Sequence, residues 1–205
     1  MENLRLIVGL GNPGAEYART RHNAGFLVVE RLAERWRAGG WSYEKKLNAR
    51  LTRANRENGP VLLCQPQTYM NSSGEAVAAV LDFYQVPVAQ LLVVVDDADL
   101  PFGELRLRPG GSSGGHHGLE SIEQYLSSRD YARQRIGIGR REGPREITGH
   151  VLGRFNSTEA AALDKLLTVA SEQADAWVDA GIQKAMSQFN GVVIEDDAGN
   201  ERKDQ

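Results

Sequence analysis

The sequence predicts a single α/β domain in which a mostly parallel, mixed sheet carries helices on both faces. Segments with strand-like patterns alternate with segments whose apolar residues recur at helical spacing, which is typical of strands joined by helices. Residues 91–95 are five consecutive branched aliphatic residues, as expected of a central strand covered on both faces. Leu105 and Leu107 instead alternate with arginines, which indicates a strand with one face open to solvent.

A long loop separates the first expected strand from the first expected helix. Residues 4–9 form an apolar run that ends in a loop rich in glycine and proline. Asn23 is placed to cap the helix, whose apolar stripe continues to Trp36. Because ligands of open α/β sheets bind beyond the carboxyl ends of the strands, this loop is a candidate for part of a site.

The remaining elements follow from the same patterns. Ser72 and Glu75 have the spacing of a capping box at the start of a second helix. Two more helices are expected, from His117 to about residue 127 and from about Ser157 onward. Further strands are expected at residues 47–53, 61–65, 105–108 and 135–139. We assign residues 1–192 to the domain and residues 193–205 to a polar, flexible tail.

Composition limits the kind of protein. Apolar residues make up 41% and charged residues 25% of the 205-residue chain, as in ordinary globular domains. No apolar stretch reaches the roughly 20 residues that a membrane-spanning helix needs, and the N-terminus has no basic-then-apolar signal segment. We therefore expect a cytoplasmic protein that does not enter membranes.

Charge is unevenly distributed along the chain. The formal net charge is −3, which argues against general affinity of the whole surface for nucleic acid. Residues 104–145 nevertheless carry eight arginines against five acidic residues. This stretch is either an ordinary solvated face or a local basic patch for an anionic partner.

His22 is the candidate centre of the chemistry. Its neighbours are polar, and an imidazole that titrates near pH 6.5 can take a proton from water at neutral pH. Asp96 directly follows the central strand and could orient the ring, while Asn12 and Asn71 also lie just past apolar strands. No serine elbow of the Gly-x-Ser-x-Gly kind accompanies His22 in its loop, so we expect water to be the nucleophile.

Several other motifs have competing interpretations. Residues 9–14 match the glycine fingerprint of dinucleotide-binding folds, but the next helix starts too late to meet a pyrophosphate. The run Asp96-Asp97-Ala98-Asp99 could hold magnesium or could form a turn. Residues 110–118 could be a phosphate-binding loop, a flexible connection or, as we favour, a mobile lid. Zinc is disfavoured at His116 and His117, because no Cys or Glu lies at ligand spacing.

Four segments, in this order, resemble the bacterial-type peptidyl-tRNA hydrolase family over nearly the whole chain before the tail. They are Gly9-Leu10-Gly11-Asn12-Pro13-Gly14, Tyr17-Ala18-Arg19-Thr20-Arg21-His22-Asn23-Ala24-Gly25, Pro66-Gln67-Thr68-Tyr69-Met70-Asn71-Ser72-Ser73-Gly74 and Asp96-Asp97-Ala98-Asp99-Leu100-Pro101. The resemblance implies hydrolysis of the ester that joins a peptide to tRNA, by a monomer without a cofactor, a metal or an obligate protein partner.

The resemblance also implies roles for individual residues. His22 would be the general base, Asp96 its orienting partner, and Asn12 a group that distinguishes peptidyl from aminoacyl esters. Substrate near the scissile carbonyl would be held by Tyr17, Tyr69 and Asn71. The tRNA would be bound through Arg106, Arg108 and Arg135, mainly by phosphate contacts that do not depend on base sequence.

Two positions depart from the family pattern. His117, which we count among the substrate-binding residues, stands where the family has an asparagine expected to bind substrate, and a neutral imidazole can donate one hydrogen bond there. Glu120 stands where the family has a basic residue. The altered loop motivates an alternative, a non-catalytic RNA-binding relative with the same fold. An oxidoreductase, based on the glycine fingerprint, ranks third.

Overall fold

A single mixed sheet forms the centre of the molecule. The structure is a computed structural model that describes residues 3–139 and 144–194, and within these ranges eight strands lie in the order β2-β3-β4-β1-β5-β7-β6-β8. The strands are β1 (Arg5–Gly9), β2 (Ser42–Glu44), β3 (Ala49–Arg56), β4 (Gly59–Pro66), β5 (Leu91–Asp97), β6 (Glu104–Arg108), β7 (Ala132–Gly137) and β8 (Gly191–Val192).

Parallel pairing is confined to the middle of this sheet. β1 pairs in parallel with β4 and with β5, and β5 pairs in parallel with β7. On both sides of this group the pairs are antiparallel, from β4 through β3 to β2 and from β7 through β6 to β8. The predicted α/β class with a mixed sheet is confirmed, although the parallel part is smaller than expected.

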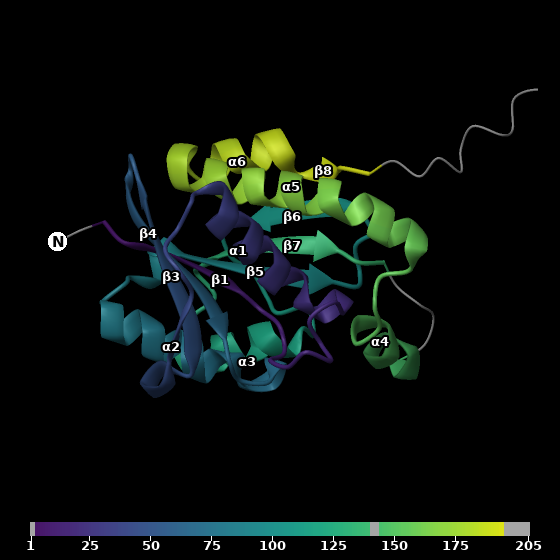
Figure 1. Cartoon of the computed structure of the whole chain (residues 1–205), viewed down its shortest axis with the longest axis horizontal. Coiled ribbons are helices and arrows are strands. Elements are labelled where there is room, and N and C mark those ends of the chain that lie inside the picture. The colour runs from purple at the N-terminus through teal and green to yellow at the C-terminus, as the bar shows by residue number, and fades with distance from the viewer. Residues whose placement is uncertain (1–2, 140–143, 195–205) are drawn as a thin grey trace, which may run out of the picture.

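Helices cover both faces of the sheet (Figure 1). On one face lie α1 (Ala24–Arg35), α5 (Ser157–Ala180) and α6 (Ile182–Phe189), and on the other lie α2 (Ser73–Tyr84) and α3 (His117–Leu126). Side chains that alternate along the strands form two apolar clusters, one against each helical layer. No helix among the described residues combines the length and the apolar character needed to cross a membrane.

The start of α1 crosses the sheet at very close range. An added Cβ on Gly25 would lie 2.3 Å from the carbonyl oxygen of Val94, and one on Gly9 would lie 2.1 Å from the carbonyl oxygen of Gly25. Only glycine permits this approach of backbone to backbone. The crossing brings the short helical turn η1 (Arg21–Asn23) to the carboxyl end of β5, where Asp96 lies.

Two expected helix caps are wrong. Asn23 does not cap α1 with its side chain, because η1 precedes that helix and the Asn23 amide instead bonds the backbone of Asn12. The capping box of Ser72 and Glu75 does not form either. The turn η3 (Met70–Ser72) leads directly into α2. The backbone amide of Gly74, in the first turn of α2, donates instead to the hydroxyl of Ser121 on the neighbouring helix α3.

Several elements lie outside the sequence-based expectations. The sequence patterns did not indicate α4 (Pro144–Val151), α6, β2 or β8, and β7 begins three residues earlier than residue 135. The amide of Val193 donates to the carbonyl oxygen of Gly103, and Val193 and Ile194 pack on the core. The packed domain therefore extends beyond residue 192, and the rest of the expected tail, residues 195–205, lies outside the described residues.

The outer edge of β6 is partly paired by a side chain. β8 pairs with Glu104 and Leu105, and further along β6 the side-chain amide of Asn190 bonds the strand instead. The backbone amide of Leu107 donates to Asn190 Oδ1 (2.7 Å), and Asn190 Nδ2 donates to the carbonyl oxygen of Leu107 (3.2 Å). Asn190 thus satisfies the same two backbone groups that a neighbouring strand would.

Candidate active site

A pocket of about 640 Å³ opens at the carboxyl edge of the parallel strands. One side is built from the loop after β1, η1 and the end of β5, and it carries Asn12, His22 and Asp96. The segment before α2 contributes Tyr69, Met70 and Asn71, and the glycine-rich loop before α3 contributes residues 114–117. α4 closes the remaining side with Thr148 and Val151, followed by Leu152.

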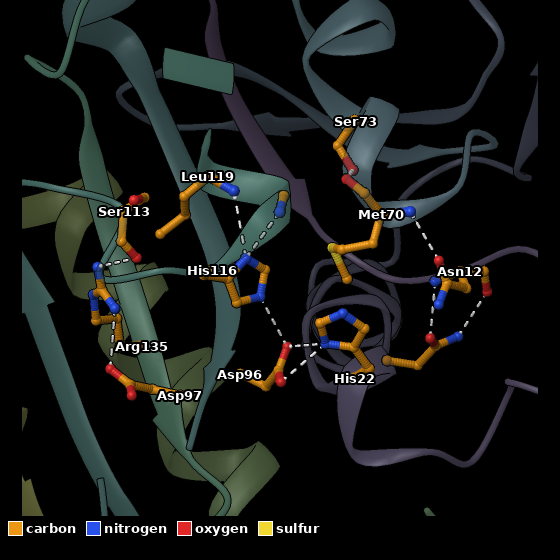
Figure 2. Close-up of polar contacts among 12 residues, drawn as sticks. Asn12, His22, Met70, Ser73, Asp96, Asp97, Ser113, His116, Leu119 and Arg135 are labelled. Carbon is orange, nitrogen blue, oxygen red and sulfur yellow. Dashed lines mark hydrogen bonds and ion pairs between the residues drawn. The ribbon is translucent and has the colours of Figure 1, made fainter. Parts of the chain in front are cut away.

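His22 and Asp96 meet as the sequence predicts. His22 Nδ1 lies 2.8 Å from Asp96 Oδ1 and 3.0 Å from Asp96 Oδ2 (Figure 2). A carboxylate only accepts, so Nδ1 carries the proton and the neutral ring has its lone pair on Nε2. No group in the described part of the chain bonds to Nε2, which is therefore available to a molecule in the pocket.

His116 is a third member of this cluster, and sequence reasoning missed it. Its Nδ1 accepts hydrogen bonds from the backbone amides of Gly118 (3.2 Å) and Leu119 (3.3 Å), so the imidazole caps α3. The proton of the neutral ring must then lie on Nε2, which donates to Asp96 Oδ1 at 3.1 Å (Figure 2). Asp96 thus accepts from two imidazoles.

Burial and charge act in opposite directions on this cluster. Burial alone would raise the pKa of Asp96, which is only 2% exposed, but the attraction of His22 and the hydrogen bonds from both histidines hold that pKa far below its ordinary value. Burial alone would lower the pKa of His22, but the negative charge and hydrogen bond of Asp96 raise it above 6.5. Asp96 is therefore a permanent anion that stabilises a protonated His22.

Asn12 is held so that it offers a donor to the pocket. The Asn23 side chain bonds both the amide and the carbonyl of Asn12, at 2.9 and 3.0 Å, and fixes the backbone there. Asn12 Oδ1 accepts from the backbone amide of Met70 at 2.8 Å. Since the side-chain oxygen is engaged, the Nδ2 group is the part of Asn12 that remains for a ligand.

The remaining acidic residues of this segment do not join Asp96. Asp97 Oδ2 lies 3.1 Å from Arg135 Nη1, and Asp97 Oδ1 accepts from the backbone amide of Asp99. These partners give Asp97 a structural reason to be there without an ion, so the expected turn explains the motif better than a magnesium site does.

Arg135 also fastens the glycine-rich loop. Its Nη2 donates to the carbonyl oxygens of Ser112 (2.8 Å) and Ser113 (3.1 Å). The α3 amides that would cradle a phosphate, those of Gly118 and Leu119, are already bonded to His116. These bonds argue against a phosphate cradle at the start of α3, whereas the predicted mobility of the loop as a lid stays a prediction.

His117 lines the pocket but does not join the cluster. Its side chain is 74% exposed, and its Nδ1 lies 2.9 Å from Glu120 Oε2 in the first turn of α3. Tyr69 and Asn71 also line the pocket from its exposed rim. The two departures from the family pattern, His117 and Glu120, therefore pair with each other at the surface.

Three predicted site residues are not among the described residues that line the pocket. Tyr17 is half-buried in the loop after β1, and its backbone carbonyl accepts from the Thr20 hydroxyl. Arg106 and Arg108 lie on β6, where Arg106 faces Arg135 across the antiparallel pair. Of the other arginines in this stretch, Arg133 is buried and bonds Glu123, whereas residues 140–143 lie outside the described residues.

Within the described part of the chain, one group of residues has ligand types that could hold a metal ion. Potential ligand atoms of His22, Asp96 and His116 all lie within 4.8 Å of one another. Metal ligation by His116 Nε2 would, however, require removal of the proton that this nitrogen donates to Asp96, because Nδ1 is bonded to two amides. The cluster fits a hydrogen-bonded triad better than a metal centre.

The fold and this pocket define the protein as an α/β enzyme equipped for general-base chemistry. The family model described as "Peptidyl-tRNA hydrolase" matches residues 6–198. The chain belongs to this family. A peptidyl-tRNA hydrolase of Synechococcus sp. (strain JA-3-3Ab) is 47% identical over 202 residues, covering 98% of this chain and 88% of the relative. One of Geobacillus kaustophilus (strain HTA426) is 43% identical, covering 91% of this chain and 100% of the relative.

Solved structures agree with these sequence relatives. The crystal structure of a peptidyl-tRNA hydrolase in complex with N-propanol is similar with a TM-score of 0.88 and 39% identity, and the match covers 95% of this chain and 98% of the other. A peptidyl-tRNA hydrolase from Acinetobacter baumannii gives a TM-score of 0.87 at 39% identity, covering 94% of this chain and 97% of the other. The family resemblance read from the sequence motifs is thus confirmed.

Proposed function

We propose that this protein hydrolyses the ester bond between a peptide and tRNA in the cytoplasm, with His22 as the general base. The observation that carries the proposal is that His22 Nδ1 donates to the carboxylate of Asp96, which leaves the Nε2 lone pair at the pocket. Membership of the peptidyl-tRNA hydrolase family supplies the substrate class.

The proposed reaction begins with water in the pocket. His22 Nε2 removes a proton from the water as its oxygen attacks the ester carbonyl carbon, and Asp96 stabilises the imidazolium that forms. When the tetrahedral intermediate collapses, the bond from carbon to the ribose oxygen breaks. The imidazolium returns its proton to that oxygen, so the products are a free peptide carboxyl group and tRNA with a free ribose hydroxyl.

Asn12 is suited to recognise the peptide part of the substrate. With Oδ1 bonded to Met70, the side chain presents Nδ2 as a donor, which a peptide carbonyl oxygen accepts. The charged amino group of an aminoacyl ester has only donors and cannot accept this hydrogen bond. The geometry therefore favours peptidyl over aminoacyl esters.

The tRNA part of the substrate would approach over the arginines of β6 and β7. Arg106 and Arg135 are neighbours across the strand pair, and Arg108 is exposed beyond them. Tyr69 and Asn71 at the rim would hold the substrate near the ester. The non-catalytic alternative rested on His117, but the bonds to Asp96 come from His22 and His116, so the altered residue does not interrupt the proposed machinery.

The direct test compares the parent with His22→Ala in release of an N-acetylated amino acid from tRNA. The His22→Ala variant should lose about 100- to 10,000-fold in kcat, the range ascribed to general acid–base catalysis, and should still bind tRNA. Undiminished turnover in His22→Ala would rule out His22 as the base. Tight tRNA binding by a parent that does not turn over would select the non-catalytic alternative.

A further inference from the structure

A partly buried ion pair joins η1, the turn that carries His22, to the start of α5. Arg21 directly precedes His22 in η1 and is 5% exposed. Its Nη2 lies 2.5 Å from Glu159 Oε2 and its Nε lies 3.3 Å from Glu159 Oε1, so the guanidinium donates two hydrogen bonds to the carboxylate. Glu159 belongs to α5, 138 residues further along the chain.

The same guanidinium also holds the end of α4. Arg21 Nη1 donates to the carbonyl oxygen of His150 at 3.2 Å, and the guanidinium lies 5.6 Å from the centre of the Phe155 ring. The backbone amide of Arg21 donates to the carbonyl oxygen of Gly153 at 3.0 Å. One residue therefore binds the last turn of α4 and the connection that follows it.

Glu159 is fixed independently of Arg21. It forms a capping box with Asn156, in which the Glu159 amide donates to Asn156 Oδ1 (2.9 Å) and the Asn156 amide donates to Glu159 Oε2 (2.7 Å). The Glu159 carboxylate that binds Arg21 is thus anchored to the first turn of a 24-residue helix packed on the sheet. It provides a rigid reference point for η1.

These contacts connect two parts of the pocket lining. His22 follows Arg21 by one residue and supplies the proposed base, whereas Val151 and Leu152 follow His150 and form the α4 wall. α4 is otherwise tied to the sheet by His150 Nε2, which donates to the carbonyl oxygen of Ile138 at 2.9 Å. The Arg21 side chain therefore joins the turn that carries the base to the segment that forms the wall.

We propose that Arg21 and Glu159 are positioning residues that set the α4 wall of the pocket relative to His22. The inference rests on the proposed function for its kinetic consequence, but its structural content is separate. Neither residue touches the pocket, so both act through the elements that they join. Removing one partner of such an ion pair leaves the other charge uncompensated. We therefore expect kcat/KM to fall when either residue is replaced.

The test uses Glu159→Gln, which keeps the size of the side chain and an acceptor for the Asn156 amide but removes the charge. The matched control is Asp175→Asn on the same helix, whose carboxylate accepts from Arg56, Arg35 and Trp36 in a similarly sheltered place. We expect Glu159→Gln to lower kcat/KM for N-acetyl-aminoacyl-tRNA by about ten- to a hundredfold, as a misplacement of about 1 Å does. The control should keep the parent value.

Two further readouts separate positioning from simple loss of stability. The pH midpoint of the activity should stay where it is, because the hydrogen bonds that His22 donates to Asp96 are intact. Hydrogen exchange of the Arg21 and Leu152 amides, which bond Gly153 and Thr148, should accelerate at least tenfold in Glu159→Gln and not in Asp175→Asn. Unchanged exchange and unchanged kcat/KM in Glu159→Gln would overturn the proposal.

A double variant provides a last check on the ion pair itself. If the two residues act as a unit, the double variant Arg21→Met with Glu159→Met should lose no more kcat/KM than the worse single variant. Additive losses would overturn the assignment to a unit. Should the parent fail to hydrolyse the substrate, the proposed function fails, and the exchange rates still decide whether this pair positions α4.

Discussion

The rings of His22 and His116 lie 5.3 Å apart, centre to centre and inclined at 48°, with one oxygen of Asp96 bonded to both. The two histidines have opposite tautomers in their neutral forms, with the proton on Nδ1 in His22 and on Nε2 in His116. Only His22 is left with a lone pair for the pocket. The arrangement therefore separates a base from a supporting donor among chemically identical side chains.

Replacing the shared acceptor should change both rate and pH dependence. In Asp96→Asn, burial still lowers the pKa of His22 but the carboxylate that raised it is gone. Since the base works in its neutral form, activity rises with pH through the pKa of His22, and the parent midpoint should lie above 6.5. The midpoint of Asp96→Asn should move to lower pH, while the plateau rate falls by about 10,000-fold as tautomer control is lost.

The pH profile of kcat/KM, measured from about pH 5 to 9, checks this prediction. A midpoint in Asp96→Asn that equals the parent value would mean that Asp96 does not set the protonation of His22. Tryptophan fluorescence at each pH serves as the control that both proteins remain folded across the range.

His116→Ala should move the midpoint in the opposite direction. Without the second donor, Asp96 attracts the proton on His22 more strongly, so the pKa of His22 rises further. The loss of the α3 cap should also lower the free energy of unfolding by about 1 kcal/mol. Parallel pH profiles and urea unfolding curves measure both effects.

His117→Ala is the neighbouring control for that variant. The His117 side chain is exposed and pairs only with Glu120 among the described residues, so its removal should leave the midpoint in place and stability within about 0.5 kcal/mol. A midpoint shift in His117→Ala as large as in His116→Ala would contradict the assignment of the supporting donor to His116.

Replacing Arg135 and replacing Arg108 should have different effects on kcat and KM. Arg108→Ala removes an exposed charge from β6, so KM should rise and the salt dependence of KM should decrease by about one phosphate contact. Arg135→Ala also releases Asp97 and the carbonyl groups of Ser112 and Ser113, and its kcat should fall as well. Kinetics at several salt concentrations would reveal the difference, and equal effects on kcat would refute it.

The crossing of α1 over the sheet should not tolerate a methyl group. In Gly25→Ala the new Cβ would meet the carbonyl oxygen of Val94, and backbone atoms cannot move aside cheaply. We expect a loss of about 3 kcal/mol in the free energy of unfolding, at the upper end of the usual range for overpacking. Gly40→Ala, where nothing lies within 4 Å, is the matched control and should be neutral or slightly stabilising. Urea unfolding of both variants decides, and similar stabilities would contradict the close approach.

The sequence predicted the central strand, the loop after β1 and the meeting of His22 with Asp96, because strand ends in an α/β sheet converge. It did not distinguish His116 from His117. Both are adjacent polar residues before a helix, and which one turns back to cap the helix depends on where α3 begins. The caps expected at Asn23 and Ser72 were wrong because bonding partners in distant segments displaced the local pattern.

The missed helices have a common cause. α4 and α6 each contain eight residues, too few to repeat an apolar stripe clearly or to be stable alone. α4 contains a glycine and a proline and owes its place to contacts with Arg21 and with Ile138, which directly follows β7. The contact between Arg21 and His150 joins residues more than 100 positions apart, so no local sequence pattern could predict it.

The Asn190 amide that bonds Leu107 has a consequence for the protein in concentrated solution. An open strand edge is a template on which a second chain can add by main-chain pairing. On β6 the template is interrupted, because β8 and then a side chain occupy the groups that an incoming strand would need. The segment after α6 thereby leaves β6 with fewer free main-chain groups for a strand of a second molecule to pair with.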